Sequence, residues 1–557
     1  MKVQQMLTIC LYSLFLSLVF YYFQHFFALR FGSYSAVLRA CLRGVGLLSF
    51  LVRFQLNSDC CHRSGGSHYL LLDEISHHLH QHGHDVRMLL QLGNPIITGL
   101  SYTGRHDSYR TSTWTLGDEY IQQFNGWFLE QQTQFLLGRD DFSNFLNFMG
   151  HLSYQCDKLL EDDKIVTFLQ EEHYDMAIVD AFNPCSFIVA HKLGVPYVAF
   201  YPGMLNGPLS MMLPSLVSFV PVCSSQLADC MNLWARAKNL LFLLMAPVCQ
   251  HLVWSRFSAV AERHLGSGSP PGGLHEFHQK AELWVFNTDF SLDFPQPLMP
   301  FTVLVGGLLN KPPAPLKQDL ETWIRGFGDA GFIVVTLGSM VSAVSVDRLV
   351  EELVTGFSVI PQGVIWRYDP KRWNPHVSLP PNVRLEEWLP LNDLLGHESV
   401  RLFITHGGQN SLLQAVYHGV PVLGIPLFGD QFDNLVRAEA KGLGLTIHPT
   451  QITSGLLSST IQTLTDDMRF KASALLLSRI HKSHPVPPAL RLVQWVEHVL
   501  QSGGAGHLRP SFLSQPWYQR YMLDLALLLS LILLAPLVLC LVLCRHRGKR
   551  AKEKKVQ

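Results

Sequence analysis

Short, strongly hydrophobic runs alternate with amphipathic stretches along most of the chain. In the second half, the runs GFIVVTLGS, VIWRY and RLFITHGG are rich in β-branched and aromatic residues, with helical patterns between them. In the first half, YDMAIVD and VPYVAFYP flank the helix-like stretch PCSFIVAHKLG. Buried strands that alternate with helices are typical of a parallel sheet wound with helices. The pattern therefore predicts two doubly wound, Rossmann-like α/β domains that face each other across a cleft.

A linker rich in glycine and proline, GGLLNKPPAPLKQD, separates the two predicted domains. A chain of 557 residues is long enough for two hydrophobic cores of ordinary size. We expect a hydrophobic signal or anchor region at 1–60, an N-terminal domain at 61–305, the linker at 306–319, a C-terminal domain at 320–520, a transmembrane helix at 521–544 and a basic tail at 545–557.

The C-terminal apolar run is long enough to cross a bilayer as a helix. Within 521–544 only Asp524 and Ser530 interrupt it, and the tail after Cys544 is strongly basic. Basic flanks stay on the cytoplasmic side, so this segment predicts a single-pass type I protein with a lumenal body. The final KKVQ resembles the dilysine retrieval signal of endoplasmic-reticulum membrane proteins. A buried core helix is the alternative.

The N-terminal region resembles a secretory signal without a clear cleavage site. An apolar run over 6–31 follows Lys2, and a second apolar run covers 47–56. A cleaved signal and a retained anchor both remain open. The eleven cysteines show no paired Cys-x-x-Cys spacing, so we expect neither a zinc site nor a disulfide framework.

Composition and missing motifs exclude several function classes. The chain carries 43 basic and 43 acidic residues, a balance that argues against a nucleic-acid partner. No Gly-x-Gly-x-x-Gly follows a predicted strand, which disfavours an NAD-dependent oxidoreductase. No Asp-x-Asp occurs, so no metal or other cofactor is expected. A histidine-rich helix is interpreted as a polar solvated face rather than a metal site. Its histidines are His77, His78, His80, His82 and His84.

One stretch of the second half, FITHGGQNSLLQAVYHGVPVLGIPLFGDQ, combines a strand, a glycine turn and a helix. After the strand at 402–405 the backbone turns at Gly407 and Gly408, and a helix begins near Asn410. Backbone amides at such a helix start favour an anion such as a diphosphate. A tight turn needed only for packing is the alternative.

Two candidate catalytic residues lie in the first half. His68 starts a helix whose apolar positions Leu72, Ile75 and Leu79 have helical spacing. Asp180 closes the strand MAIVD, at the sheet edge where doubly wound folds bind ligands. Taken alone, the two residues are better interpreted as a helix cap and the start of a turn. The apolar stretch at 232–254 could likewise be core, or a surface helix that enters the lumenal leaflet.

Together these motifs resemble the UDP-glycosyltransferase family, which includes the UDP-glucuronosyltransferases. Trp388 precedes His406 by eighteen residues, and Asp430 follows His406 by twenty-four. The similarity begins near Gly65, and GGSHYLLLD, KAELWVFNTDF, FGDAGF and the stretch SHPVPPALRLVQWVEHVLQSGGAGHLRP resemble the animal family-3 subgroup in particular. The resemblance implies a GT-B fold with an N-terminal acceptor domain and a C-terminal UDP-sugar domain.

The resemblance also implies roles for individual residues. His68 would be the catalytic base and Asp180 its orienter, while Trp388 would lie against the uracil. Asp430 and Gln431 would bind the sugar hydroxyls. The residues implied at the diphosphate are Gly338, Ser339, His406, Gly408, Asn410 and Ser411.

Two positions depart from the family pattern. Gln414 stands where the family usually has a glutamate that binds the ribose, and Leu391 stands where it usually has glutamine. An amide oxygen still accepts the ribose bond but loses on the order of 1 kcal/mol of charge assistance. We therefore expect weaker binding of UDP-sugar rather than none.

The implied activity is the inverting transfer of glucose, N-acetylglucosamine or glucuronate from a UDP-sugar to a small lipophilic alcohol. A membrane is the further expected partner, and homo- or hetero-oligomers remain open. UDP-sugar binding without catalysis is the alternative function. It is motivated by NSDCCHRS at 57–64, which interrupts the strand that family members run directly into the Gly-Ser-His turn.

Overall fold

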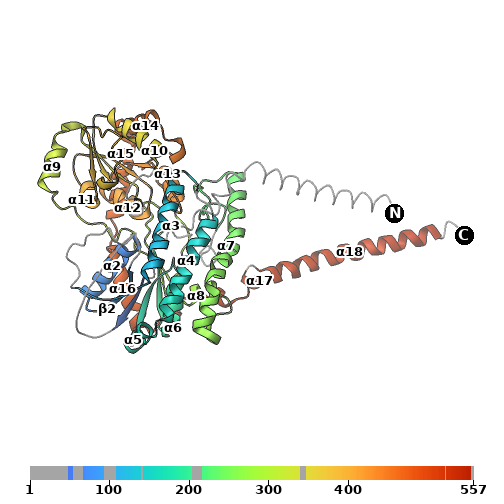
Figure 1. The fold of residues 1–557 in the computed structure, drawn as a ribbon. Coiled ribbons are helices and arrows are strands. Elements are labelled where there is room, and N and C mark those ends of the chain that lie inside the picture. Colours follow the sequence, from blue (N-terminus) through green and yellow to red (C-terminus); the bar gives the residue numbers. More distant parts are fainter. Residues whose placement is uncertain are drawn as a thin grey trace. The chain divides into compact units, whose positions relative to one another are not determined.

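The computed structural model describes residues 48–53, 67–92, 108–139, 142–203, 216–338, 341, 346–520 and 522–553. The chain divides into two compact units, one that ends at Ala505 and one that begins at Gly506. The first unit contains both predicted α/β halves, and its helices and strand β2 are labelled in Figure 1.

The first half is built on a seven-stranded sheet in the order β3-β2-β1-β4-β5-β6-β7. Its strands are β1 (Leu48–Arg53), β2 (Asp85–Leu92), β3 (Arg110–Thr115), β4 (Met176–Asp180), β5 (Tyr197–Tyr201), β6 (Trp284–Phe286) and β7 (Thr302–Leu304). Neighbouring strands are parallel except at β1, which is antiparallel to both β2 and β4. The expectation of a wholly parallel sheet is wrong here. An antiparallel ladder also pairs the backbone groups of β2 and β4, so either direction of β1 fills the gap.

The second half is built on a six-stranded sheet in the order β10-β9-β8-β11-β12-β13. Its strands are β8 (Phe332–Thr336), β9 (Gly363–Arg367), β10 (Val383–Glu386), β11 (Val400–Thr405), β12 (Val422–Gly424) and β13 (Gly444–Thr446). All the strand pairs described in this sheet are parallel. Every residue of β8 is buried, as its continuous apolar run predicts for a strand with helices on both faces.

Helices surround both sheets (Figure 1). Those of the first half are α2 (Ser67–Gln81), α3 (Asp118–Leu136), α4 (Phe142–Glu161), α5 (Asp163–Glu171), α6 (Pro184–Leu193), α7 (Leu233–Leu265) and α8 (Leu274–Lys280). Those of the second half are α9 (Gln318–Arg325), α10 (Asp347–Ser358), α11 (Leu391–Leu395), α12 (Gln409–His418), α13 (Gln431–Ala440), α14 (Ser454–Asp466) and α15 (Met468–Lys482).

Helix α16 (Pro488–Gln501) follows the second half in sequence but packs against the first half. Arg491 donates to the carbonyl of Leu304 at 3.0 Å, and the buried His84 lies 3.2 Å from Glu497. The predicted C-terminal domain at 320–520 includes α16, whereas in the structure this helix packs against the first half. The expectation of a solvated face is therefore wrong for His84, which is buried where α16 packs against the first half.

The structure contains a disulfide between Cys156 of α4 and Cys185 of α6. The expectation of no disulfide is therefore wrong for this pair. The two cysteines lie 29 positions apart on different helices, with Cα atoms 5.6 Å from each other. A pairing set by helix packing leaves no local spacing in the sequence, so the sequence did not reveal it.

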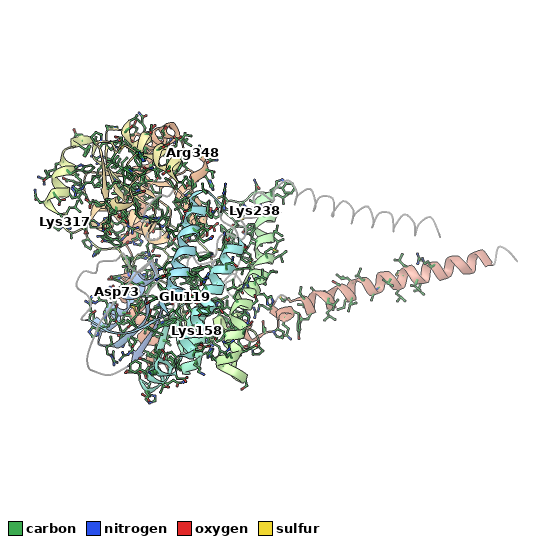
Figure 2. The ribbon with its side chains drawn as sticks, in the orientation of Figure 1. Asp73, Glu119, Lys158, Lys238, Lys317 and Arg348 are labelled. Atoms are coloured by element: carbon green, nitrogen blue, oxygen red, sulfur yellow. A yellow bond between two sulfur atoms is a disulfide. The ribbon has the colours of Figure 1, made fainter. Side chains whose placement is uncertain are left out.

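Helix α7 exposes an apolar face. Leu233, Trp234 and Leu244 are 66%, 77% and 64% exposed, whereas Asn239 is fully buried on the opposite side. The stretch at 232–254 is therefore a surface helix rather than core. Lys238, labelled in Figure 2, lies on the same helix. By length and composition α7 resembles a membrane helix, although it packs against α4 and α6.

The second unit contains α17 (Trp517–Arg520) and α18 (Leu523–Glu553). The apolar part of α18, Leu523–Arg545, is long enough to cross a membrane, and its described side chains are exposed. This helix covers most of the predicted transmembrane segment.

Candidate active site

His68 and Asp180 contact each other at the carboxyl edge of the first sheet. His68 lies in the first turn of α2, and Asp180 is the last residue of β4. Nδ1 of His68 lies 2.8 Å from Oδ2 of Asp180, and both side chains are buried. A carboxylate can only accept, so the hydrogen bond places the proton on Nδ1 and leaves Nε2 as the basic nitrogen. The arrangement suits proton abstraction by His68.

Neighbouring groups fix the orientation of this pair. The N–H of Phe182 donates to Oδ1 of Asp180 at 3.0 Å, so each carboxylate oxygen has a partner. The ring of Phe182 stands edge-on to His68 with a centroid distance of 5.6 Å. Asn183 caps α6 by accepting from the N–H of Cys185 at 3.1 Å. Asp180 is thus held at the rigid junction between β4 and α6.

The second sheet brings Gly338 and His406 together. Gly338 follows β8 and His406 follows β11, the adjacent strands between which the strand order reverses. Ligands of doubly wound folds bind at this position. A Cβ atom on Gly338 would lie 2.6 Å from Nε2 of His406, and the φ of Gly338 is +91°. Both facts require glycine. Ser339 lies outside the described residues, so its place beside Gly338 stays a prediction.

Helix α12 begins at Gln409, one residue before the predicted start. Gly408 is its N-cap in an extended conformation, and no side chain caps the first amides. Gly407 has a φ of +84°, and a Cβ atom there would lie 2.5 Å from Cγ of Leu435. The close approach of α13 therefore explains why a glycine stands at position 407. The uncapped amides at the start of α12, beside His406, are available to an anion.

Three further candidates lie on α12. Oδ1 of Asn410 accepts a 2.6 Å hydrogen bond from Asn287 of the first half, so its NH₂ group is the side that can meet a ligand. Ser411 and Gln414 are partly exposed on the same helix. No pattern in the sequence indicated the contact with Asn287, which lies 123 positions away.

Trp388 is half-exposed and has a cationic partner that the sequence analysis missed. The guanidinium of Arg367 lies 5.3 Å from the ring centroid of Trp388 and also donates to the carbonyl of Gly338. Burial lowers the pKa of Arg367. Arg367 is the last residue of β9. An arginine at the carboxyl end of a predicted strand was the feature of the sequence that could have marked it as a site residue. Arg367 thus contacts both Trp388, the candidate uracil residue, and Gly338, a candidate diphosphate residue.

Asp430 and Gln431 have distinct hydrogen-bonding roles at the start of α13. Oε1 of Gln431 accepts from the N–H groups of Leu427 at 2.6 Å and Phe428 at 3.2 Å. Its Nε2 is buried and has no hydrogen-bond partner among the described residues. A buried donor without a partner is costly, which points to a ligand acceptor at this position. Gln431 therefore offers a donor, while the carboxylate of Asp430 offers an acceptor.

Asn434 holds the start of α13 against the glycine turn. Its amide nitrogen donates to Oδ2 of Asp430 at 2.8 Å and to the carbonyl of Gly407 at 2.9 Å. This residue was not singled out from the sequence. Its two bonds connect the candidate sugar site with the candidate diphosphate site.

Comparison with known proteins agrees with these motifs. A family model described as UDP-glucoronosyl and UDP-glucosyl transferase matches residues 62–557. The chain belongs to this family of UDP-glycosyltransferases. Within it, UDP-glucuronosyltransferase 3A1 of Bos taurus is 43% identical over 86% of this chain and 90% of its own length. UDP-glucuronosyltransferase 3A2 of Homo sapiens is also 43% identical, over the same shares. The predicted resemblance to the family-3 subgroup is confirmed.

A more distant relative and a solved structure complete the comparison. The 2-hydroxyacylsphingosine 1-beta-galactosyltransferase of Mus musculus is 33% identical over 84% of this chain and 83% of its own length. The structure titled Spinosyn Forosaminyltransferase SpnP superposes with a TM-score of 0.50 at 20% identity, over 78% of this chain and 96% of that one. This UDP-glycosyltransferase therefore has the GT-B fold.

Proposed function

We propose that this UDP-glycosyltransferase transfers a hexosyl group with inversion to a hydroxyl group of a small lipophilic acceptor. The hydrogen bond of 2.8 Å between His68 and Asp180 carries the proposal. Nε2 of His68 takes the hydroxyl proton while the acceptor oxygen bonds to the anomeric carbon, and UDP leaves with the electrons of the broken bond. Asp180 holds the tautomer and stabilises the imidazolium.

The diphosphate is bound without a metal ion in this proposal. The uncapped amides at the start of α12 and the adjacent His406 provide donors where negative charge develops on the departing UDP. The NH₂ group of Asn410 adds a further donor at the same helix start. Trp388, oriented by Arg367, presents an aromatic face for the uracil.

A neutral sugar, glucose or N-acetylglucosamine, fits the site better than glucuronate. A buried carboxylate needs a cation to offset its desolvation. Arg437, the basic residue nearest to Gln431 in sequence, is buried and already paired with Asp293. The unpartnered Nε2 of Gln431 suits a hydroxyl or carbonyl oxygen of a neutral sugar. One relative is named for the transfer of galactose, which is also neutral.

We place the catalytic body in the lumen of the endoplasmic reticulum, anchored by α18. The basic tail favours the cytoplasmic side, and the disulfide between Cys156 and Cys185 requires an oxidising compartment. Helix α7, which exposes an apolar face, carries Arg236 and Lys238 and, up to Glu262, has no acidic residue. Such a helix suits the surface of a bilayer, from which a lipophilic acceptor would be drawn.

Product formation and UDP binding, measured separately, test this proposal. Full-length protein is incubated with a phenolic acceptor and each UDP-sugar, and products are identified by mass. His68→Ala should reduce transfer at least about 100-fold because the base is lost. Its UDP affinity should change less than about threefold, since donor and base lie on different sheets. A variant that keeps more than about a hundredth of the rate would refute His68 as the base.

The donor screen also tests the sugar assignment. Gln431→Glu keeps an oxygen that accepts from the N–H groups of Leu427 and Phe428. It removes the Nε2 donor that would bind the sugar. It should lose transfer from neutral donors while still binding UDP. If the wild type prefers UDP-glucuronate, the assignment of a neutral sugar is wrong. If the wild type binds UDP but transfers none of the sugars, the protein is a UDP-sugar-binding member of the family.

A further inference from the structure

The buried carboxylate of Asp433 joins α13 to the first half of the chain. Asp433 lies two residues after Gln431, in the first turn of the helix. Its Oδ2 accepts from the N–H of Ser224 at 2.7 Å, and its Oδ1 accepts from the N–H of Gln226 at 2.8 Å. We call the stretch 216–226, which precedes α7, the tethered segment. Each oxygen of one carboxylate thus holds one amide of this segment.

The backbone of the tethered segment is strained at the two residues that Asp433 binds. Ser224 has a φ of +71° and Gln226 a φ of +51°, both in the left-handed region that side chains disfavour. Such conformations persist only where the surroundings hold them, and they concentrate at functional positions. Asp433 supplies a bond to each strained residue. The strain and the tether therefore belong to the same local structure.

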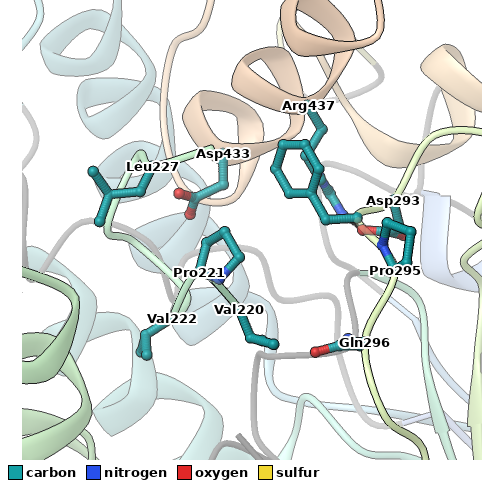
Figure 3. A pocket seen from close by; sticks show the side chains of 10 residues that line it. Val220, Pro221, Val222, Leu227, Asp293, Pro295, Gln296, Asp433 and Arg437 are labelled. Carbon is teal, nitrogen blue, oxygen red and sulfur yellow. Dashed lines mark ion pairs between the residues drawn. The ribbon is translucent and has the colours of Figure 1, made fainter. Parts of the chain in front are cut away.

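A second side chain holds the tethered segment from the side of α7. Asn239 is fully buried, and its Oδ1 accepts from the N–H of Val222 at 2.7 Å. Its Nδ2 donates to the carbonyls of Val217 at 2.9 Å and Val220 at 2.7 Å. The segment is thus fixed between α7 and α13. Figure 3 shows the small cavity beside it, into which Asp433 and Arg437 extend from the same helix.

The first half also approaches the start of α13 at the carboxyl edge of its own sheet, the edge where His68 and Asp180 lie. Gly203 follows β5 at that edge, and a Cβ atom on it would lie 3.8 Å from Oδ2 of Asp430. The candidate sugar-binding residues, Asp430 and Gln431, are held by other groups. Asn434 bonds to Asp430, and the amides of Leu427 and Phe428 bond to Gln431. Loss of the Asp433 tether would therefore release the first-half segment and leave the donor residues in place.

We propose that Asp433 is a positioning residue that fixes the tethered segment against the sugar-binding end of α13 and so sets the acceptor side of the active site. This proposal rests on the proposed transferase function. Burial raises the pKa of Asp433 to about 6, although the two N–H bonds oppose the shift. Both carboxylate oxygens accept from backbone N–H groups, an arrangement that favours the ionised form. The two hydrogen bonds from backbone N–H groups offset the cost of burying the carboxylate of Asp433.

Asp433→Asn in the full-length protein tests the proposal with little change in shape. The amide keeps one acceptor but turns an NH₂ group toward a backbone N–H. Hydrogen exchange of the tethered segment should rise at least about tenfold, since one charge-assisted bond is lost. With the acceptor varied, KM should rise about tenfold, whereas the KM for UDP-sugar should stay within about twofold.

Asp162→Asn is the matched control, because Asp162 also accepts from two backbone amides, those of Lys164 and Ile165, at the start of α5. It should change neither exchange in the tethered segment nor either KM. Ser224→Gly keeps the N–H and removes the strain, so it should retain wild-type acceptor KM. Both controls separate the tether from a general loss of stability.

The two measurements distinguish this proposal from the proposed function. If the wild type binds UDP but transfers no sugar, the proposed function fails, and with it the acceptor role of Asp433; exchange then reports only whether the tether exists. If transfer occurs and Asp433→Asn raises the donor KM alone, or leaves both exchange and acceptor KM unchanged, the positioning role is overturned.

Discussion

Replacement of Gly338 by alanine tests the candidate diphosphate site most directly. The new Cβ atom would lie 2.6 Å from Nε2 of His406 and 2.9 Å from its Cδ2 and Cε1. Carbon atoms in contact are about 3.5 Å apart, so His406 must move by roughly 0.5–1 Å. Overpacking of this kind costs about 1–3 kcal/mol. The left-handed φ of +91° adds about 1–2 kcal/mol for a residue with a side chain.

If displacement of His406 relieves the clash, UDP affinity should fall about 10- to 100-fold, which corresponds to about 1.4–2.8 kcal/mol. Gly83→Ala is the control, because Gly83 has the same φ of +91° but nothing within 4 Å of an added Cβ. Both variants should lose stability on thermal unfolding, and only Gly338→Ala should lose UDP affinity by calorimetric titration. UDP binding within about threefold of wild type in Gly338→Ala would refute the assignment of this site.

Two other predictions concern the body of the protein and its membrane. Replacing both Cys156 and Cys185 by alanine should lower the free energy of unfolding by about 3–4 kcal/mol, because the disulfide closes a loop with 29 positions between its ends. Reductant should bring the wild type to the same midpoint, and equal stability of the oxidised wild type and the variant would contradict the pairing. A photo-crosslinking residue at Leu244 should label phospholipid in the reconstituted full chain, whereas one at Val359, similarly exposed beyond α10, should not. Cross-linked dimers in place of lipid adducts would argue against membrane contact.

The strands and helices of the two sheets could be predicted because their signals are local. Continuous apolar runs marked β4 and β8, and the glycine turn marked the start of α12 to within one residue. The direction of β1 could not be predicted in this way. Its apolar run indicates a strand, but the direction depends on pairing with β2 and β4, which lie far along the chain.

The residues of the candidate site also differ in whether local sequence could reveal them. His68, Asp180 and His406 follow predicted strands or open predicted helices, so their position made them candidates, and the family resemblance selected them. Asp433 and Asn287 act through partners 209 and 123 positions away, and no spacing in the sequence records those contacts. Arg367 is intermediate, because its place at a strand end was visible but its contact with Trp388 was not.

The reversed β1 bears on whether this UDP-glycosyltransferase can catalyse transfer. The interrupted sequence before α2 suggested that His68 lacks support, which would leave a protein that only binds UDP-sugar. In the structure α2 is held by its own apolar face, with Leu71, Leu72 and Ile75 buried, and by packing against β2 and α16. It also packs against β1, which lies between β2 and β4 in the sheet. The bond between His68 and Asp180 forms with β1 in this reversed direction, so the interrupted sequence does not by itself separate the catalytic pair.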